Sequence, residues 1–372
     1  MKELVFNEST KKVLSLVYRE QPISRKDIAV KSGLSKAAVS FSVDELLGCG
    51  MIQETDVAEA AGRSGPKPIN LCVNGSYAYV VSIFMRLLNP FAVVYDFAGN
   101  SVNCYPFSKT LYATFGELLE ESVSISKKAM ADLGREKILA VSVSIAGNVE
   151  DNTVVHCPYY DASKLNITQE MRKALGVDVY VERDVYNMAY GEHWLGAGKE
   201  YADFITLWIG TGIGSATIVN SQLIKGAKGL AGEIGFMVID KEAYGEGPYT
   251  LDGFGNFERN ASARLLEEKH KKSFREIVEL ARSDESVLRE LYALCDDLAM
   301  GLANGVALLN PASIVINGRF RYAGELVGEY LEQRLAQLCP IDCRVEFSTL
   351  GETAIMLGGT YFVLNKVFGI TF

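Results

Sequence analysis

The sequence has no run of about 20 consecutive apolar residues, the length that a helix needs to cross a bilayer. It also has no C-x-x-C pair, since its seven cysteines are scattered and the nearest two are Cys339 and Cys343. Scattered thiols in an odd number are typical of a reduced cytosolic protein rather than of a disulfide framework or a zinc site. The first twelve residues are mostly polar and include no apolar signal segment. These absences predict a cytoplasmic protein with no membrane partner.

Positive charge is also scarce. The chain has 37 Lys and Arg against 46 Asp and Glu, a formal net charge of −9, which argues against wrapping of nucleic acid by the whole molecule. Residues 1–70 are nearly balanced, with 10 basic and 9 acidic side chains, so the remainder has 27 against 37. A local DNA-binding face is therefore compatible with the composition. At 372 residues and 48% apolar content the chain can form two or three domains with buried cores.

The first fifty residues have the pattern of three short helices. Apolar residues after Asn7 recur at helical spacing, and Asn is a residue type that caps helices. A second helix is predicted over 25–31, between the cap Ser24 and the stop Gly33, and a third over 36–47. Two short helices with a Gly-containing turn form a helix-turn-helix, whose second helix enters the major groove by its N-terminal side chains. The candidates for contacts with DNA are Ser35, Lys36, Ala37 and Ser40.

A β-hairpin wing is expected after these helices, with strand-like runs at 51–54 and 69–72. Its tip is GRSGPKP, at 62–68. Arg63 and Lys67 on a loop stiffened by Gly and Pro are placed to contact phosphates or a minor groove. The alternative is a three-helix docking domain followed by a flexible linker.

From Tyr77 onward the pattern changes to strands that alternate with helices, which predicts an α/β architecture. Strands are predicted at 79–85, 91–95 and 101–105, a helix at 115–133, and a buried strand at 138–145 followed by Gly147 and Asn148. A later strand begins at 179 and ends in Arg183 and Asp184. An acid at the carboxyl end of such a strand is well placed for a binding cleft.

The segment 204–240 combines two apolar runs with a glycine-rich turn between them. The turn contains Gly210, Thr211, Gly212 and Gly214. Two strands joined in this way present backbone N–H groups that suit a phosphate. Four more glycines, at 226, 229, 232 and 235, then surround the single carboxylate Glu233, which suggests a backbone folded closely against a small ligand. From the glycines alone, a hairpin followed by an ordinary loop is the alternative.

The order strand, GTGIG, strand, AGEIG resembles the signature of the ROK family, whose members are sugar kinases, open reading frames and repressors. The resemblance covers nearly the whole chain, and ROK repressors begin with a winged helix that ROK kinases usually lack. It implies a winged helix-turn-helix over 1–74 and a two-lobed, actin-like α/β body of the sugar-kinase type. The first lobe would comprise 75–183, completed by the C-terminal helix 352–372, and the second lobe 184–351.

The resemblance also implies roles for single residues. Asp184 matches the general base of the family, here vestigial, and Arg183 replaces a sugar-binding Asn. Glu233 and Glu258 match two acids that bind sugar hydroxyls, and we assign Gly147 and Asn148 to the same ligand site. A guanidinium at Arg183 favours an anionic sugar derivative, or alternatively fills the pocket. Asp184 could equally serve only as a cap of the next helix.

Several departures from the family concern nucleotide and metal. The Asp-x-Gly-x-Thr phosphate loop is replaced by SIFMR at 82–86, which lacks the acid and the glycine that position ATP and Mg²⁺. The usual double glycine of the adenosine-side strand reads Asn317-Gly318. The positions of the zinc-binding His and Cys hold Phe236, Tyr249, Leu251 and Asn256. We therefore expect neither ATP nor zinc as a cofactor, and a loop held by packing of Phe236, Tyr249, Leu251, Phe254 and Phe257.

The expected function is a carbohydrate-responsive transcriptional regulator, a repressor, that binds operator DNA as a homodimer and has no kinase activity. We expect the sugar to close the cleft between the lobes, to change the spacing of the two winged helices and to lower operator affinity. Two alternatives stay open. One is a ROK sugar kinase that carries a DNA-binding module, and the other is a module whose pocket is closed by Arg183 and Phe236 and which acts through a protein partner.

Overall fold

The computed structural model describes residues 5–55, 69–157, 161, 165–241 and 255–371. The chain divides into two compact units, Met1–Arg183 with Gly359–Phe372, and Asp184–Gly358. In both units a β-sheet is covered by helices, so the predicted α/β class is confirmed.

The first unit begins with three helices and a small sheet in the order β1-β3-β2. The elements are α1 (Glu8–Glu20), β1 (Ile23–Ser24), α2 (Arg25–Ser32), α3 (Lys36–Gly48), β2 (Ile52–Thr55) and β3 (Asn70–Val73). The side chains of Asn7, Ser24 and Ser35 accept backbone N–H bonds and cap the three helices, and Gly33 ends α2 in the left-handed conformation at φ 69°. The helices and the first two caps were predicted correctly. The tip of the wing, with Arg63 and Lys67, lies outside the described residues.

The larger sheet of the first unit has the order β10-β7-β4-β5-β6. Its strands are β4 (Tyr79–Met85), β5 (Phe91–Asp96), β6 (Ser101–Tyr105), β7 (Ile138–Ile145) and β10 (Asp178–Arg183), and the hairpin β8 (Asn148–Glu150) and β9 (Thr153–His156) follows β7. Its helices are α4 (Phe115–Leu133), α5 (Ile167–Leu175) and most of α12 (Thr353–Phe368), with η1 (Gly75–Tyr77) and η2 (Arg135–Lys137) as short 3-10 turns. β4, β7 and β10 are parallel, whereas β5 and β6 run antiparallel to their neighbours.

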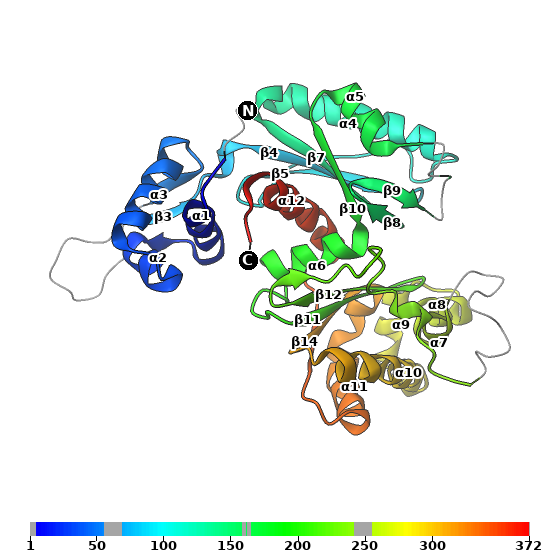
Figure 1. The fold of residues 1–372 in the computed structure, drawn as a ribbon. Coiled ribbons are helices and arrows are strands. Elements are labelled where there is room, and N and C mark those ends of the chain that lie inside the picture. Colours follow the sequence, from blue (N-terminus) through cyan, green and yellow to red (C-terminus); the bar gives the residue numbers. More distant parts are fainter. Residues whose placement is uncertain (1–4, 56–68, 158–160, 162–164, 242–254, 372) are drawn as a thin grey trace. The chain divides into compact units, whose positions relative to one another are not determined.

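Alternation along β4 decides which helix covers which face of this sheet. Val81 and Ile83 belong to the core that includes α4 and α5, whereas Val80 packs with Val363 of α12 on the other face. Ser82 and Thr360 share a buried hydrogen bond of 2.9 Å on that second face. Figure 1 shows α4 and α5 on one side of the sheet and α12, in red, on the other.

The last residues of the chain pack against the first helix. The hydroxyl of Tyr18 in α1 donates to the carbonyl of Phe97 at 2.5 Å, and the Phe97 ring lies 5.6 Å from that of Phe368 at the end of α12. The backbone N–H of Thr371 donates to the hydroxyl of Ser15 in α1 at 3.0 Å. The winged helix is thus packed against the body within the first unit.

The second unit is built on a sheet of order β13-β12-β11-β14-β15. Its strands are β11 (Phe204–Ile209), β12 (Ile213–Val219), β13 (Gln222–Leu223), β14 (Ser313–Gly318) and β15 (Arg344–Phe347). Its helices are α6 (Asp184–Leu195), α7 (Asn256–Ala261), α8 (Arg264–His270), α9 (Phe274–Ala281), α10 (Glu285–Leu309) and α11 (Gly324–Leu338), with η3 (Ile234–Phe236) and η5 (Arg319–Ala323). Leu207, Ile209 and Ile316 face the core formed with α10 and α11, and α6 lies on the opposite face (Figure 1).

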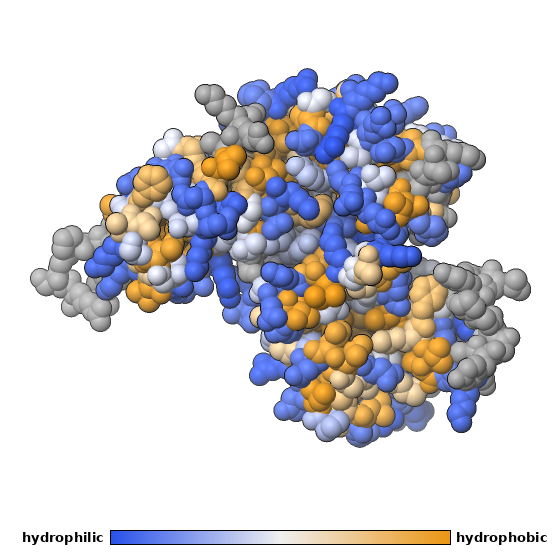
Figure 2. Space-filling model, viewed as in Figure 1, coloured by the Kyte–Doolittle hydropathy of each residue, from blue (hydrophilic) through white to orange (hydrophobic). Residues whose placement is uncertain are grey.

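Helix α10 is, within the described part of the chain, the one helix long and apolar enough to cross a membrane. More than half of its most apolar window is buried, and Leu298 and Leu302 belong to the core of the second unit. Its other side leaves Met300 and Leu308 exposed, to 39% and 78%. Figure 2 shows apolar surface over the part of this unit that α10 and α11 form.

Candidate functional site

The predicted phosphate turn joins β11 and β12 as a tight hairpin. Ile209 pairs with Ile213, and the N–H of Gly210 donates across the turn to the carbonyl of Gly212 at 3.0 Å. The hydroxyl of Thr211 accepts a hydrogen bond from Arg319 at 3.3 Å, and Arg319 is also paired with Glu267. The hairpin is present as expected, but Gly210 and Thr211 already have partners inside the protein.

Glu258 lies where three segments meet. One carboxylate oxygen accepts the N–H of Ile213 in the phosphate turn at 3.0 Å, and the other accepts the N–H of Gly255 at 2.8 Å. A β-carbon on Gly235 would lie 3.0 Å from the same carboxylate. Glu258 therefore ties the turn, the segment after Glu233 and the start of α7 together. Its two backbone bonds are a structural role that the sequence pattern did not indicate.

Glu233 is exposed at the end of a loop that is held by Tyr186 of α6. The Tyr186 hydroxyl lies 3.0 Å from the carbonyl of Gly229 and 2.9 Å from that of Ala231, and its ring is almost wholly buried. Gly232 adopts a φ of 92°, and a β-carbon there would lie 2.3 Å from the carbonyl of Ser215. A side chain cannot replace this glycine, and Tyr186 fixes the loop that carries the acid.

The ends of two parallel strands carry the candidates of the first unit. Arg183, the last residue of β10, is paired in register with Ile145 at the end of β7 and is 6% exposed. Gly147, two residues after the end of β7, has a φ of 150°, and a β-carbon there would lie 2.3 Å from the carbonyl oxygen of His156. The side-chain oxygen of Asn148 is buried and accepts no hydrogen bond from the described residues. An acceptor in this state is ready to receive a donor such as a hydroxyl.

Asp184 is the first residue of α6, and one of its carboxylate oxygens accepts the N–H of Val185 at 2.8 Å. An acid at this place can start the helix or face a ligand, so both interpretations of Asp184 stay open.

Asn256, at one of the positions where the family has a zinc ligand, takes part in a network of side-chain amides and one carboxylate. Asn256 accepts the N–H of Ile239 at 2.8 Å and donates to Asp240 at 3.1 Å, and Asn260 donates to the same oxygen of Asp240 at 3.0 Å. Within the described residues no cluster of His, Cys, Asp and Glu could hold a metal ion. This network and the buried Phe257 hold the start of α7 and the residues before 241 in place.

The expected packing of five aromatic and apolar residues needs correction at one position. Phe236, the last residue of the 3-10 turn η3, is 38% exposed and is therefore not buried in the core as expected. Phe257 is fully buried against Gly301, as expected. Tyr249, Leu251 and Phe254 lie outside the described residues.

A buried polar network surrounds the adenosine-side turn. The amide nitrogen of Asn317 donates to Glu192 at 2.9 Å, to Ser348 at 3.1 Å and to the carbonyl of Gly351 at 3.1 Å. Glu192 is fully buried, and burial raises the pKa of its carboxyl. Hydrogen bonds from Ser348 and other groups lower this pKa, but by less than burial raises it. The side chain of Asn317 thus has partners inside the protein, and no sequence pattern singled out Glu192.

The segment 82–86, at the position of the first phosphate loop, is the end of β4. Ile83 and Met85 are fully buried and Phe84 is 4% exposed. The guanidinium of Arg86 lies 4.5 Å from the Phe84 ring. Buried apolar side chains thus occupy 83–85, and Arg86 lies beside them.

The candidate DNA-binding residues lie on α3 and its N-cap. Lys36 and Ala37 are exposed. The hydroxyl of Ser35 accepts the N–H of Ala38 at 3.2 Å, and the hydroxyl of Ser40 accepts a bond from Arg25 at 3.3 Å.

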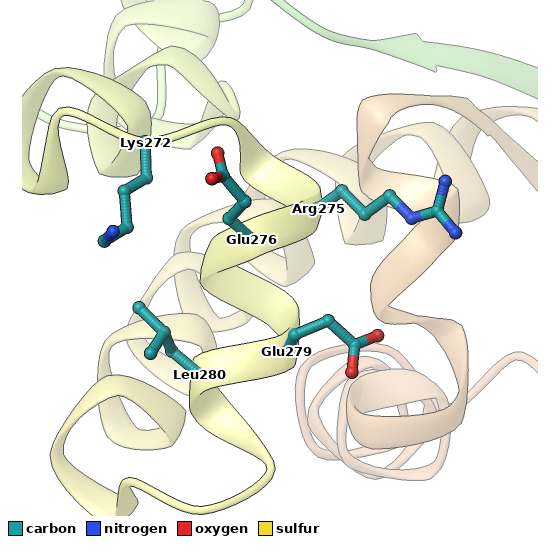
Figure 3. A pocket seen from close by; sticks show the side chains of 5 residues that line it. All are labelled: Lys272, Arg275, Glu276, Glu279 and Leu280. Carbon is teal, nitrogen blue, oxygen red and sulfur yellow. The ribbon is translucent and has the colours of Figure 1, made fainter.

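One surface hollow of about 440 Å³ lies apart from all of these candidates. Lys272, Arg275, Glu276, Glu279 and Leu280 line it, and Figure 3 shows that most of them project from α9. The guanidinium of Arg275 lies 5.5 Å from the ring of Tyr322. The hollow is open and lined by side chains of both charges, so its lining does not indicate a particular ligand.

Comparisons with known proteins agree with this arrangement. Residues 6–53 match a family described as winged helix-turn-helix DNA-binding, and residues 92–366 match the ROK family. The xylose repressor of Caldicellulosiruptor bescii is 25% identical over 388 residues, which cover 95% of each chain. A ROK family transcriptional regulator, described as a homolog of the E. coli MLC protein, superposes with a TM-score of 0.78 at 21% identity over 97% of this chain and 96% of its own.

A ROK family glucokinase from Streptomyces griseus shares the body, with a TM-score of 0.63 and 22% identity over 77% of this chain and 99% of its own. The winged helix followed by an actin-like, sugar-kinase-type α/β body is therefore confirmed. The chain belongs to the ROK family and carries an N-terminal winged helix-turn-helix.

Proposed function

We propose that the protein is a cytoplasmic, carbohydrate-responsive transcriptional repressor that binds operator DNA as a homodimer. The observation that carries the proposal is the combination of a DNA-binding module with a ROK body whose phosphate-binding parts are filled by its own side chains. Relatives over 95% of the chain are named xylose repressors, so a pentose such as D-xylose is the first effector to test.

The proposal includes the absence of kinase activity. The segment at the first phosphate loop is buried and apolar, Thr211 is bonded to Arg319, and Asn317 belongs to a buried network. Phosphoryl transfer depends on groups that position phosphates and Mg²⁺, and the acid and the glycine of the family's first phosphate loop have no counterpart at 82–86. The rival, a sugar kinase with a DNA-binding module, is favoured by Asp184 and by the fold shared with the glucokinase. Release of ADP above background with D-xylose or D-glucose would decide for the rival.

For the effector we propose Glu233 as the main hydroxyl-binding acid of the second unit, because it is exposed on the loop that Tyr186 holds. Asp184 and Glu258, which the resemblance to the family also assigns to the sugar site, stay proposed ligand contacts. In the first unit Asn148 and Arg183 stay proposed ligand contacts, since one offers a buried acceptor and the other a guanidinium that suits an anionic sugar.

Thermal shift measurements test this assignment. The panel is D-xylose, D-glucose, xylonate and a sugar phosphate. A ligand at 100 times its Kd stabilises the native state by about 2.7 kcal/mol, which raises the melting temperature measurably. Glu233→Gln is expected to abolish the shift without lowering the melting temperature of the free protein. Glu200→Gln, a change at an exposed acid between α6 and β11, is the matched control. No shift with any sugar would contradict the assignment and favour regulation through a protein partner.

A further inference from the structure

The outward face of α3 carries an apolar pair. Ala37 and Phe41 are both exposed, Phe41 to 64%, and residues four apart in a helix lie on the same face. The opposite face of α3, with Val39, Val43 and Leu46, is fully buried in the core of the winged helix. Phe41 is therefore not part of that core.

The polar groups on this face are largely engaged within the winged helix itself. Ser35 caps α3, and Ser40 accepts a bond from Arg25 at 3.3 Å. Arg25 is also paired with Asp44 at 2.8 Å, so the one exposed acid of the face is neutralised. These bonds leave the face with one cation, Lys36, next to an aromatic ring and a methyl group.

In a major groove the C5-methyl of thymine is the apolar group that an A·T base pair presents and a G·C pair lacks, and Ala and Phe side chains are types that contact it. The side chains of a recognition helix near its N-terminus reach the base edges. We propose that Ala37 and Phe41 read thymine methyl groups, and that the operator half-site has thymine at the positions they face. This inference deepens the proposed function and rests on the winged helix binding DNA.

The test uses the full-length protein and DNA that it selects from a random duplex library. Each thymine of the selected half-site is replaced in turn by deoxyuridine, which removes the methyl group and keeps every hydrogen-bonding edge. Affinity is measured by fluorescence anisotropy at one fixed salt concentration, because phosphate contacts make affinity salt-dependent. We expect one or two thymines at which the replacement weakens wild-type binding by about fourfold, the value for burial of one methyl-sized group.

Phe41→Ala is expected to bind the thymine and uracil duplexes equally at one of these positions, and Phe41→Leu to keep part of the difference. Val30→Ala changes another exposed apolar residue, on α2 and 75% exposed, and is expected to keep the full difference. Wild-type protein that tolerates uracil at every position would overturn the inference and leave the proposed repressor intact. A Phe41→Ala protein that loses its oligomeric state but keeps the thymine preference would also overturn it, and would assign Phe41 to a protein contact. Failure to select any DNA would contradict both proposals.

Discussion

Glu258 has two possible roles, one in binding a ligand and one in holding the backbone. The match to a family motif predicts that Glu258 binds a sugar hydroxyl. In the structure its two carboxylate oxygens instead accept hydrogen bonds from the N–H groups of Ile213 and Gly255. Glu258→Gln turns one acceptor into a donor that faces an N–H group, so we expect a loss of about 1–3 kcal/mol in the free energy of unfolding without ligand. Urea unfolding measures this, with Glu233→Gln as the control that stays near wild type. Equal stability of the two variants would contradict the structural role of Glu258.

Glu192 makes stability depend on pH. Burial raises the pKa of its carboxyl above the ordinary value of 4.5, so the folded protein holds this proton more tightly than the unfolded chain does. The stabilisation from Glu192 is then fully present below pH 4.5 and is lost as the pH rises through the raised pKa.

The comparison with Glu192→Gln isolates this effect, because Gln does not titrate. We expect the free energy of unfolding of the wild type, relative to the variant, to fall as the pH rises from about 4.5 to neutrality. Urea unfolding at a series of pH values gives the difference. A difference that grew with pH would show that hydrogen bonds to the carboxylate outweigh its burial.

Sequence patterns predicted residue roles where the cause is local. Asn7 and Ser24 cap the helices that follow them, because a cap acts on residues two or three positions away. Tyr186 and Glu192 were missed as supports of the site, because their partners, at Ala231 and Asn317, lie 45 and 125 residues further along the chain. No spacing rule joins such pairs.

Among the elements, α12 depends on glycines that allow close approach. A β-carbon on Gly358 would lie 1.6 Å from the carbonyl oxygen of Asn187 and 2.7 Å from the nitrogen of Gly191, both in α6. Gly358→Ala must push α12 and α6 apart, and we expect a loss of about 1–3 kcal/mol or insoluble protein. Gly116→Ala in α4 meets its nearest atom at 3.8 Å, so it should match or slightly exceed wild-type stability. The melting temperatures of both variants are compared with that of the wild type. A Gly358→Ala protein as stable as the wild type would contradict the close packing of α12 and α6.

The strands were the elements that the sequence predicted best. β4, β6 and β7 have the bounds expected from apolar runs between turn residues. The segment around η3 was predicted less well, because its order comes from Asp240 and two asparagines rather than from the aromatic residues that the pattern emphasised. Polar networks leave no periodic signal.

At the scale of the whole molecule, the proposed homodimer needs a surface for a second copy. Met300 and Leu308 are about two turns apart on α10 and exposed, and Leu309 is exposed beside them in sequence. We expect Leu308→Asp to give a monomer with weakened operator binding, because a buried, unpaired charge is costly and one half-site alone binds weakly. Sedimentation equilibrium measures the mass, and Leu111→Asp, at a residue of the first unit that is 63% exposed, is the control. A dimer that survives Leu308→Asp would place the interface elsewhere.

The central claim is that sugar occupancy of the ROK body controls DNA binding by the winged helix. Titration of fluorescent selected operator with the wild-type protein, with and without saturating D-xylose and at one salt concentration, tests it most directly. A coupling free energy of ordinary size predicts that the sugar weakens operator binding by roughly 5- to 150-fold. Identical affinities, with a sugar that the same protein binds in a thermal shift, would contradict the claim.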